Sequence, residues 1–183
     1  MPIKLIATCL TPGQEQACKA QGIEIIHNYA RALGEITPGC VTDFSIHCFN
    51  SETLAVLKTL GASRATLHPE LNLAQIRDIK KHINTEAIIY GKIPLMKLGN
   101  PIQSRQITDR TGTTFPINSD TIYNSVPIYM ADKLTEIEKS GITHSRLIFT
   151  NESPDEIQKI IESYKHQKPP KTQFTRGKYY SKV

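Results

Sequence analysis

The chain is predicted to fold as an α/β protein, a partial (β/α) barrel of the TIM type with about six parallel strands and an inserted β-hairpin. Short strand-like runs rich in isoleucine recur at a nearly fixed interval, and helix-like segments lie between them. This alternation favours a parallel sheet with right-handed crossovers, and it breaks after Gly99. A closed parallel barrel takes eight strands, usually in about 250 residues. With 183 residues, the chain is too short for one.

The expected strands are four to seven residues long and mix isoleucine with threonine or aromatic residues, a composition typical of strands. They are IKLIATC (3–9), IEIIH (23–27), FSIHC (44–48), RATLH (64–68), AIIYG (87–91) and HSRLIFT (144–150).

The expected helices carry start and stop signals. Ser51 and Ser153 are placed as N-caps, Pro154 suits the first turn, and Gly61 suits a helix end. The helices span residues 11–22, 51–61, 71–82, 131–141 and 153–167. Between residues 28 and 43, glycines and a proline leave room for only a very short helix.

After Gly99 two β-prone stretches, around Ile107 and from Thr113 to Ile117, flank the turn signal DRTG (109–112), which predicts the hairpin. Residues 1–167 are therefore assigned to the partial barrel. Residues 168–183 form a basic, aromatic C-terminal tail.

The charge is unevenly distributed. Residues 1–162 carry 16 Lys and Arg against 17 Asp and Glu, a balance of −1, whereas residues 163–183 carry six basic residues and no acidic one. The basic character therefore belongs to the tail and does not mark the whole protein as a nucleic-acid binder. No apolar run is long enough for a membrane span, and four cysteines fit a reducing compartment, so a cytoplasmic protein is expected.

Polar residues follow the predicted strands, where parallel α/β folds place their functional edge. They are Cys9, His27, His47, Cys48, His68, Glu70, Tyr90 and Lys92. They predict either an acid–base or metal site, or simply strand ends near solvent. No C-x-x-C or H-E-x-x-H spacing connects them, so no metal and no other cofactor is assigned.

The tail sequence QFTRGKYYSKV interleaves aromatic and basic residues. This pattern suits single-stranded RNA, and Arg176, Lys178 and Tyr179 are its candidate contacts. The alternative is a C-terminal strap that docks on the body or continues into another chain.

An ordered set of segments carries a family resemblance: HCFNS (47–51), ATLHPELNLAQI (65–76), EAIIYGKIPLM (86–96), ITDRTGTTFPI (107–117), IYNSVPIYMADKL (122–134), SRLIFTNESPDEIQKII (145–161) and FTRGKYY (174–180). Together they resemble the collagenase-like peptidase family U32, specifically the second half of its barrel domain. The family name implies peptide hydrolysis. Several members instead serve oxygen-independent hydroxylation of RNA bases or ubiquinone precursors with a four-cysteine iron–sulfur cluster. The corresponding stretch here, KLGNPIQSRQITDR, has no cysteine.

The resemblance places Tyr90 and Lys92 at a barrel strand end beside His68 and Glu70. Glu70, Tyr90 and Lys92 are the candidate catalytic residues, with Lys92 expected to pair with Glu70 or to bind an anionic group. The candidate substrate-binding residues are His47, Asn50, His68 and Arg110.

Three functional hypotheses follow. The first is a fragment or subunit of a larger U32-type enzyme, with a peptide or RNA substrate. The second is a non-catalytic binding or assembly module that has lost the cluster cysteines, and the third is a stand-alone hydrolase. An incomplete barrel also predicts a homo-oligomer or a companion chain, with strands 3–9 and 145–150 as the exposed seams.

Overall fold

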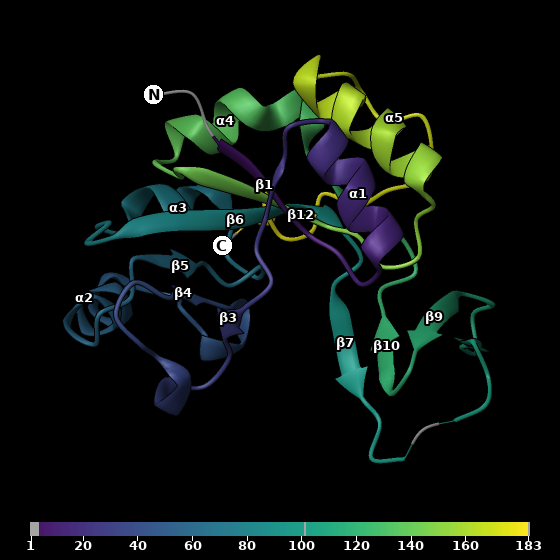
Figure 1. Cartoon of the computed structure of the whole chain (residues 1–183), viewed down its shortest axis with the longest axis horizontal. Coiled ribbons are helices and arrows are strands. Elements are labelled where there is room, and N and C mark those ends of the chain that lie inside the picture. Colours follow the sequence, from purple (N-terminus) through teal and green to yellow (C-terminus); the bar gives the residue numbers. More distant parts are fainter. Residues whose placement is uncertain (1–3, 101, 183) are drawn as a thin grey trace.

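The computed structural model describes residues 4–100 and 102–182. Its main element is a curled half-barrel of seven parallel strands in the order β2-β1-β12-β6-β5-β4-β3, with β11 antiparallel to β6 (Figure 1). The strands are β1 (Lys4–Thr8), β2 (Glu24–Ile25), β3 (Tyr29–Ala30), β4 (Val41–Thr42), β5 (Arg64–Thr66), β6 (Asn84–Gly91), β11 (Ile128–Tyr129) and β12 (His144–Ile148). The predicted partial TIM-type barrel is confirmed.

The two edge strands of this sheet, β2 and β3, are consecutive in the chain. Only residues 26–28 separate them, so the two edges are held within about 14 Å of each other. Strands β1 and β12 pair with each other along their whole length and lie inside the sheet. The prediction that these two strands form exposed seams is therefore wrong, because the curl of the sheet brings the first and last long strands together.

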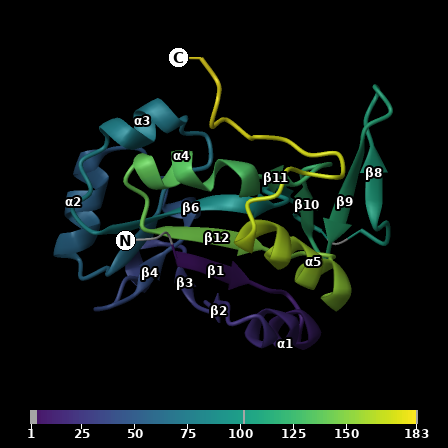
Figure 2. The ribbon, with the colours of Figure 1, turned by 90° about the horizontal axis from the view of Figure 1, so that it is seen from above.

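Five α-helices cover the outer face of the sheet (Figure 2): α1 (Pro12–Ala20), α2 (Ser51–Thr59), α3 (Leu73–Asp78), α4 (Leu134–Lys139) and α5 (Pro154–Lys165). All five were predicted, and a capping box at Ser153 starts α5 as expected. The N-cap of α2 is Asn50 rather than Ser51.

One predicted strand is wrong. The segment 44–48 contains a short 3₁₀ helix, η2 (Phe44–Ile46), and the strand at this place is β4, just before it. The chain leaves the sheet at Asp43, and His47 has a left-handed backbone (φ 55°), which a strand does not allow. Segment 28–43 supplies β3, β4 and a second 3₁₀ helix, η1 (Leu33–Glu35), so the sheet has one more strand than expected.

The inserted hairpin is confirmed and belongs to a separate four-stranded antiparallel sheet, here called the arm. Its strands are β7 (Pro94–Lys97), β8 (Gln106–Thr108), β9 (Thr114–Asn118) and β10 (Thr121–Tyr123), in the order β7-β10-β9-β8. The arm follows the carboxyl end of β6 and projects from the half-barrel (Figure 1). The predicted turn joins β8 to β9, and Asp109 accepts backbone hydrogen bonds there from Thr111 and Thr113.

The tail from residue 168 to residue 182 runs over the helical side of the body (Figure 2). Thr175 pairs with the β11 segment through two backbone hydrogen bonds, and further along the backbone carbonyl of Tyr179 accepts from Leu73. The tail is thus the docked strap that was considered beside the RNA-binding interpretation. Among the described helices, none is both long and apolar enough to cross a bilayer.

Alternate residues of the strands face two different environments. On the outer face, Ala7, Ala87 and Leu147 join helix residues in one apolar core. On the inner face the strands carry buried polar residues, including Glu86 and Arg146, beside Ile6 and Ile88. The expectation of an uncovered apolar interior is therefore wrong, since charged side chains fill it.

Candidate functional site

A network of charged side chains occupies the inner face of the half-barrel. Glu86 of β6 has no solvent exposure, and its carboxylate lies 2.9 Å from Arg64 Nε and 3.3 Å from Arg146 Nε. Its other contact is the Thr66 hydroxyl, which donates at 2.7 Å. The Arg146 guanidinium also donates to Asp43 Oδ1 at 2.8 Å. Two guanidinium groups and two carboxylates therefore balance inside the sheet, as buried ions require.

The network reaches solvent at the carboxyl ends of the strands. Asp43 follows β4, and its second carboxylate oxygen lies 3.6 Å from Nε of the exposed Arg31. Deeper inside, the Arg146 guanidinium lies 4.2 Å from the centre of the Tyr29 ring, within cation–π range. Burial raises the pKa of the Tyr29 phenol, so it stays protonated and remains a donor. The interior thus holds buried ion pairs in fixed positions. They lie below the opening of the half-barrel at the carboxyl ends of its strands, here called the mouth.

Four rings form a partly exposed cluster on the rim of this mouth. The His68 ring stacks on Phe49 with centroids 4.3 Å apart and on His47 at 5.2 Å, while Phe44 meets it edge-on. Burial lowers the pKa of His68, and its Nδ1 accepts from the backbone N–H of Glu70 at 3.4 Å. His68 is therefore neutral near neutral pH, with its proton on Nε2, and can donate to a ligand at the rim.

A third carboxylate lies just beyond the end of β12. Glu152 accepts from the Tyr90 hydroxyl at 3.1 Å and from the backbone N–H groups of Thr150 and Asn151 at 2.7 and 3.1 Å. Burial, followed by the charge of Glu152, raises the pKa of Tyr90. Tyr90 therefore acts as a permanent donor that positions Glu152, and it is not available as a phenolate.

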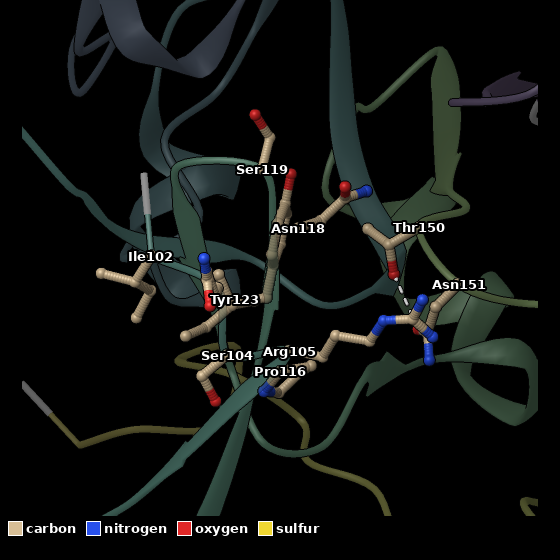
Figure 3. Close-up of a pocket in the computed structure, with 11 residues that line it drawn as sticks. Ile102, Ser104, Arg105, Pro116, Asn118, Ser119, Tyr123, Thr150 and Asn151 are labelled. Carbon is tan, nitrogen blue, oxygen red and sulfur yellow. Dashed lines mark hydrogen bonds between the residues drawn. The ribbon is translucent and has the colours of Figure 1, made fainter. Parts of the chain in front are cut away.

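A groove of about 480 Å³ separates the base of the arm from the carboxyl end of β12 (Figure 3). Its volume falls within the usual range of ligand pockets, about 300–1,000 Å³. It is lined by Ile102, Gln103, Ser104, Arg105, Pro116, Ile117, Asn118, Ser119, Tyr123, Thr150 and Asn151. Arg105 extends across it towards Thr150 and Asn151 (Figure 3), and no carboxylate is among the lining residues. The groove thus offers one cation, several amides and hydroxyls, and an apolar wall.

The structure brings some of the predicted site residues together and keeps others apart. His47, His68 and Glu70 meet at the rim. In the described part of the chain, no hydrogen bond or ion pair joins any two of Glu70, Tyr90 and Lys92. Tyr90 is buried against α5 instead, and Lys92 lies half-buried where the arm begins. The expected Lys92–Glu70 pair is therefore not formed.

Other predicted contacts have structural partners. The side-chain oxygen of Asn50 caps α2 by accepting from Thr53. Arg110 lies at the exposed hairpin turn of the arm. Arg176 binds Asp132 through both of its terminal nitrogens, at 2.6 and 2.8 Å.

The remaining tail candidates differ in exposure. The Tyr179 ring is buried, and its hydroxyl donates to the carbonyl of Ile88 at 2.6 Å. Lys178 is exposed. Two of the three residues expected to contact RNA therefore hold the tail on the body.

Sequence reasoning missed Asp43, Arg64, Arg146, Glu152 and Arg105. A detectable signal existed for the interior, because a single charged residue immediately precedes an apolar run in both EAIIYG and SRLIF. Such a charge on a buried face needs a partner of opposite sign. No comparable signal marks Arg105, since the arm that positions it is exposed throughout this segment.

The four cysteines do not suit an iron–sulfur cluster. Cys9 and Cys18 lie together, with sulfurs 3.6 Å apart, whereas Cys40 follows η1 and Cys48 is buried after η2. Within residues 4–100 and 102–182, no three His, Cys, Asp or Glu side chains are arranged to hold a metal ion.

The chain is similar to a known protein family. A sequence model described as peptidase family U32 matches residues 35–168, which include the charge network, the rim and the arm. Neither the curated proteins nor the solved structures contain a significant match to the chain.

Proposed function

Because this chain belongs to peptidase family U32, we propose that it is the substrate-binding part of a larger U32-type enzyme and binds an extended peptide in the groove between arm and half-barrel. The observation that carries the proposal is the groove at the carboxyl end of β12. Binding sites of parallel α/β folds lie at this end of the strands.

The lining of the groove favours a peptide with an acidic side chain. Side-chain amides of Asn118 and Asn151 and the hydroxyl of Thr150 suit the alternating donors and acceptors of an extended backbone. Arg105 has no ion-pair partner among the described residues, so its guanidinium is available to a carboxylate of the ligand.

RNA is the less favoured ligand. Single-stranded RNA needs stacking aromatics among several cations, whereas the groove has one cation and one aromatic ring, Tyr123. In the tail, Arg176 and Tyr179 are committed to Asp132 and to the body. Hydroxylation of RNA bases or quinone precursors would also need the cluster that the cysteines here do not suit.

Two further polar groups lie outside the groove lining, and a longer peptide would have to reach them. They are His68 at the rim and Glu152, which follows the lining residue Asn151 and lines a separate cavity with Tyr90. In the proposed enzyme, His68 donates from Nε2 to a peptide carbonyl, and Glu152, held by Tyr90, accepts a proton or positions water. Among the described residues that line the groove, no serine or threonine hydroxyl is hydrogen-bonded to a histidine or a carboxylate. This favours a subunit that receives catalytic groups from elsewhere, and it equally favours the second candidate, a binding module without turnover.

The test uses two fluorescein-labelled ten-residue peptides that differ only by Glu or Gln at the centre. Fluorescence anisotropy with the full chain should show tighter binding of the acidic peptide. Arg105→Gln should weaken that binding about 10- to 100-fold, the loss expected for a charge-assisted hydrogen bond of about 1.5–3 kcal/mol. Lys139→Gln, at an exposed position of α4, removes the same charge far from the groove and should change nothing.

Equal affinity for the two peptides, or an unchanged affinity in Arg105→Gln, rules out the groove as the site. A labelled RNA oligonucleotide of similar length is the competing ligand, and tighter binding of that oligonucleotide rejects the peptide. Cleavage of the bound peptide by the isolated chain, followed by mass spectrometry, separates a stand-alone hydrolase from a binding module.

For a partner chain, we propose pairing at β8, the outer strand of the arm. Gln106, Ile107 and Thr108 are exposed, and β8 has a strand neighbour on one side only. Unpaired strand edges invite pairing with another chain. If light scattering shows a dimer, Thr108→Pro should dissociate it; a dimer that survives this change lies elsewhere. We place the protein in the cytoplasm, where reducing conditions would keep its cysteines as thiols.

A further inference from the structure

Two cysteines from different elements place their sulfur atoms in contact. Cys9 follows β1 directly, Cys18 lies in the last turns of α1, and their Sγ atoms are 3.6 Å apart. Both are free thiols. Formation of a disulfide needs an approach of about 1.5 Å, to the usual bond length near 2 Å. Both residues precede the segment that matches the U32 family, so this pair is a feature of the chain outside that match.

The chemistry of this pair differs from that of the other cysteines. The hydrogen bond between the sulfurs lowers the pKa of Cys18 and, together with burial, raises the pKa of Cys9. The pair therefore holds its remaining proton between the two sulfurs once the first proton is lost. Cys9 is half-buried and reachable by a small oxidant. By contrast, burial raises the pKa of Cys48 to about 12 and leaves that thiol unreactive.

The cysteine pair connects to the groove through α1. Gln14, three residues beyond the N-cap Thr11, donates from Nε2 to the carbonyl of Thr150 at 3.3 Å and to that of Glu152 at 2.9 Å. Thr150 lines the groove. The β1–α1 connection is short, so drawing Cys18 towards Cys9 moves the same helix that holds the 150–152 turn.

We propose that Cys9 and Cys18 form an oxidisable pair that a peroxide converts to a disulfide, and that the disulfide repositions the 150–152 turn of the groove. One sulfur attacks a peroxide oxygen, and the O–O bond breaks with hydroxide as the leaving group. The attacking sulfur becomes a sulfenic acid. The other sulfur then displaces the sulfenic hydroxyl to form the S–S bond. The two thiols lose two electrons, and their two protons complete two molecules of water. A dithiol reductant reverses the change.

The experiment treats the reduced full-length protein with one equivalent of hydrogen peroxide, alkylates the remaining thiols, and maps the peptides without reduction. We expect a Cys9–Cys18 crosslink with the loss of two hydrogens, while Cys40 and Cys48 are alkylated. Closing a ten-residue loop should raise the melting temperature by about 5–10 °C. Hydrogen exchange of the Thr150 amide should change, because that amide donates within the turn.

Cys18→Ser should abolish the crosslink and both other effects, and Cys40→Ser is the matched control that should keep all three. Oxidation that reaches Cys40 as fast as Cys9, or sulfinic acid on Cys9 without a crosslink, overturns the assignment. A crosslink that leaves exchange at residues 150–152 unchanged overturns the coupling to the groove. These readouts on the wild-type chain need no variant and no peptide ligand, so they do not depend on the proposed function.

Discussion

Replacing Arg146 by methionine tests the charge network most directly. Arg146 is 2 % exposed, and methionine keeps an unbranched apolar stem while removing the guanidinium group and its charge. The change removes the 2.8 Å contact to Asp43, the 3.3 Å contact to Glu86, and the cation–π contact to the Tyr29 ring. Glu86 keeps Arg64 as a partner, but Asp43 keeps only the weaker contact to an exposed arginine.

The expected loss in the free energy of unfolding is about 3–5 kcal/mol, the range for breaking a buried ion pair by removing one partner. The matched control is Arg31→Met. Arg31 contacts the same Asp43 carboxylate at 3.6 Å, but its side chain is 70 % exposed. An exposed pair of this kind contributes at most about 1 kcal/mol. The two variants thus compare the stability that Asp43 gains from a buried guanidinium with the stability that it gains from an exposed one.

Urea denaturation followed by far-UV circular dichroism gives the free energies, since the chain has no tryptophan for fluorescence. Adding Asp43→Asn to Arg146→Met should cost less than the sum of the two single changes, because it removes a carboxylate that has lost its buried partner. A loss below 1 kcal/mol for Arg146→Met, or equal losses for the two arginine variants, would refute the buried network as a source of stability.

Three further variants probe other parts of the molecule. Burial and neighbouring cations lower the pKa of His144 from 6.5 to about 4. Between these pH values the unfolded chain binds one more proton than the folded chain, so stability falls as the pH drops from 6.5 to 4. His144→Gln should flatten this fall in urea titrations at each pH. Gly91→Ala should lower the free energy of unfolding by at least about 3 kcal/mol, because at φ 122° the new β-carbon would lie 2.3 Å from a carbonyl oxygen of β12. The control is Gly34→Ala, which has open space around it and should stay within about 1 kcal/mol of wild type in the same denaturation assay. Tyr179→Ala should lower stability by about 3 kcal/mol, because it removes a buried ring and its hydrogen bond. The control Lys178→Ala should change stability by less than about 0.5 kcal/mol. Equal effects of the two variants in thermal melts would mean that the tail does not dock.

Local sequence patterns determined most of the elements. The alternation of isoleucine-rich runs with capped helices predicted the parallel sheet, because side-chain period and cap chemistry act within a few residues. Ser153 and Asn72 start helices with capping boxes as their sequences indicate. The turn at Asp109 likewise follows from its own hydrogen bonds. The family resemblance rested on the same local segments, and the match over residues 35–168 confirms it.

Only the tertiary structure decided which distant residues meet. The curl of the sheet places β1 beside β12, and this closure depends on twist accumulated over many strands rather than on either strand's own sequence. The same curl turns Glu86 and Arg146, isolated charges in the sequence, into one buried network with Asp43.

The candidate site was predicted in part for the same reason. His47 and His68 follow successive helix–strand units and meet at the rim as expected from strand ends. Tyr90 instead turns to the outer face, since a register shift in β6 between the pairings of Arg146 and Leu147 moves it towards α5 and Glu152. A register shift of this kind depends on the neighbouring strand. For that reason the sequence by itself predicted the strand and the tertiary structure decided which way its tyrosine points.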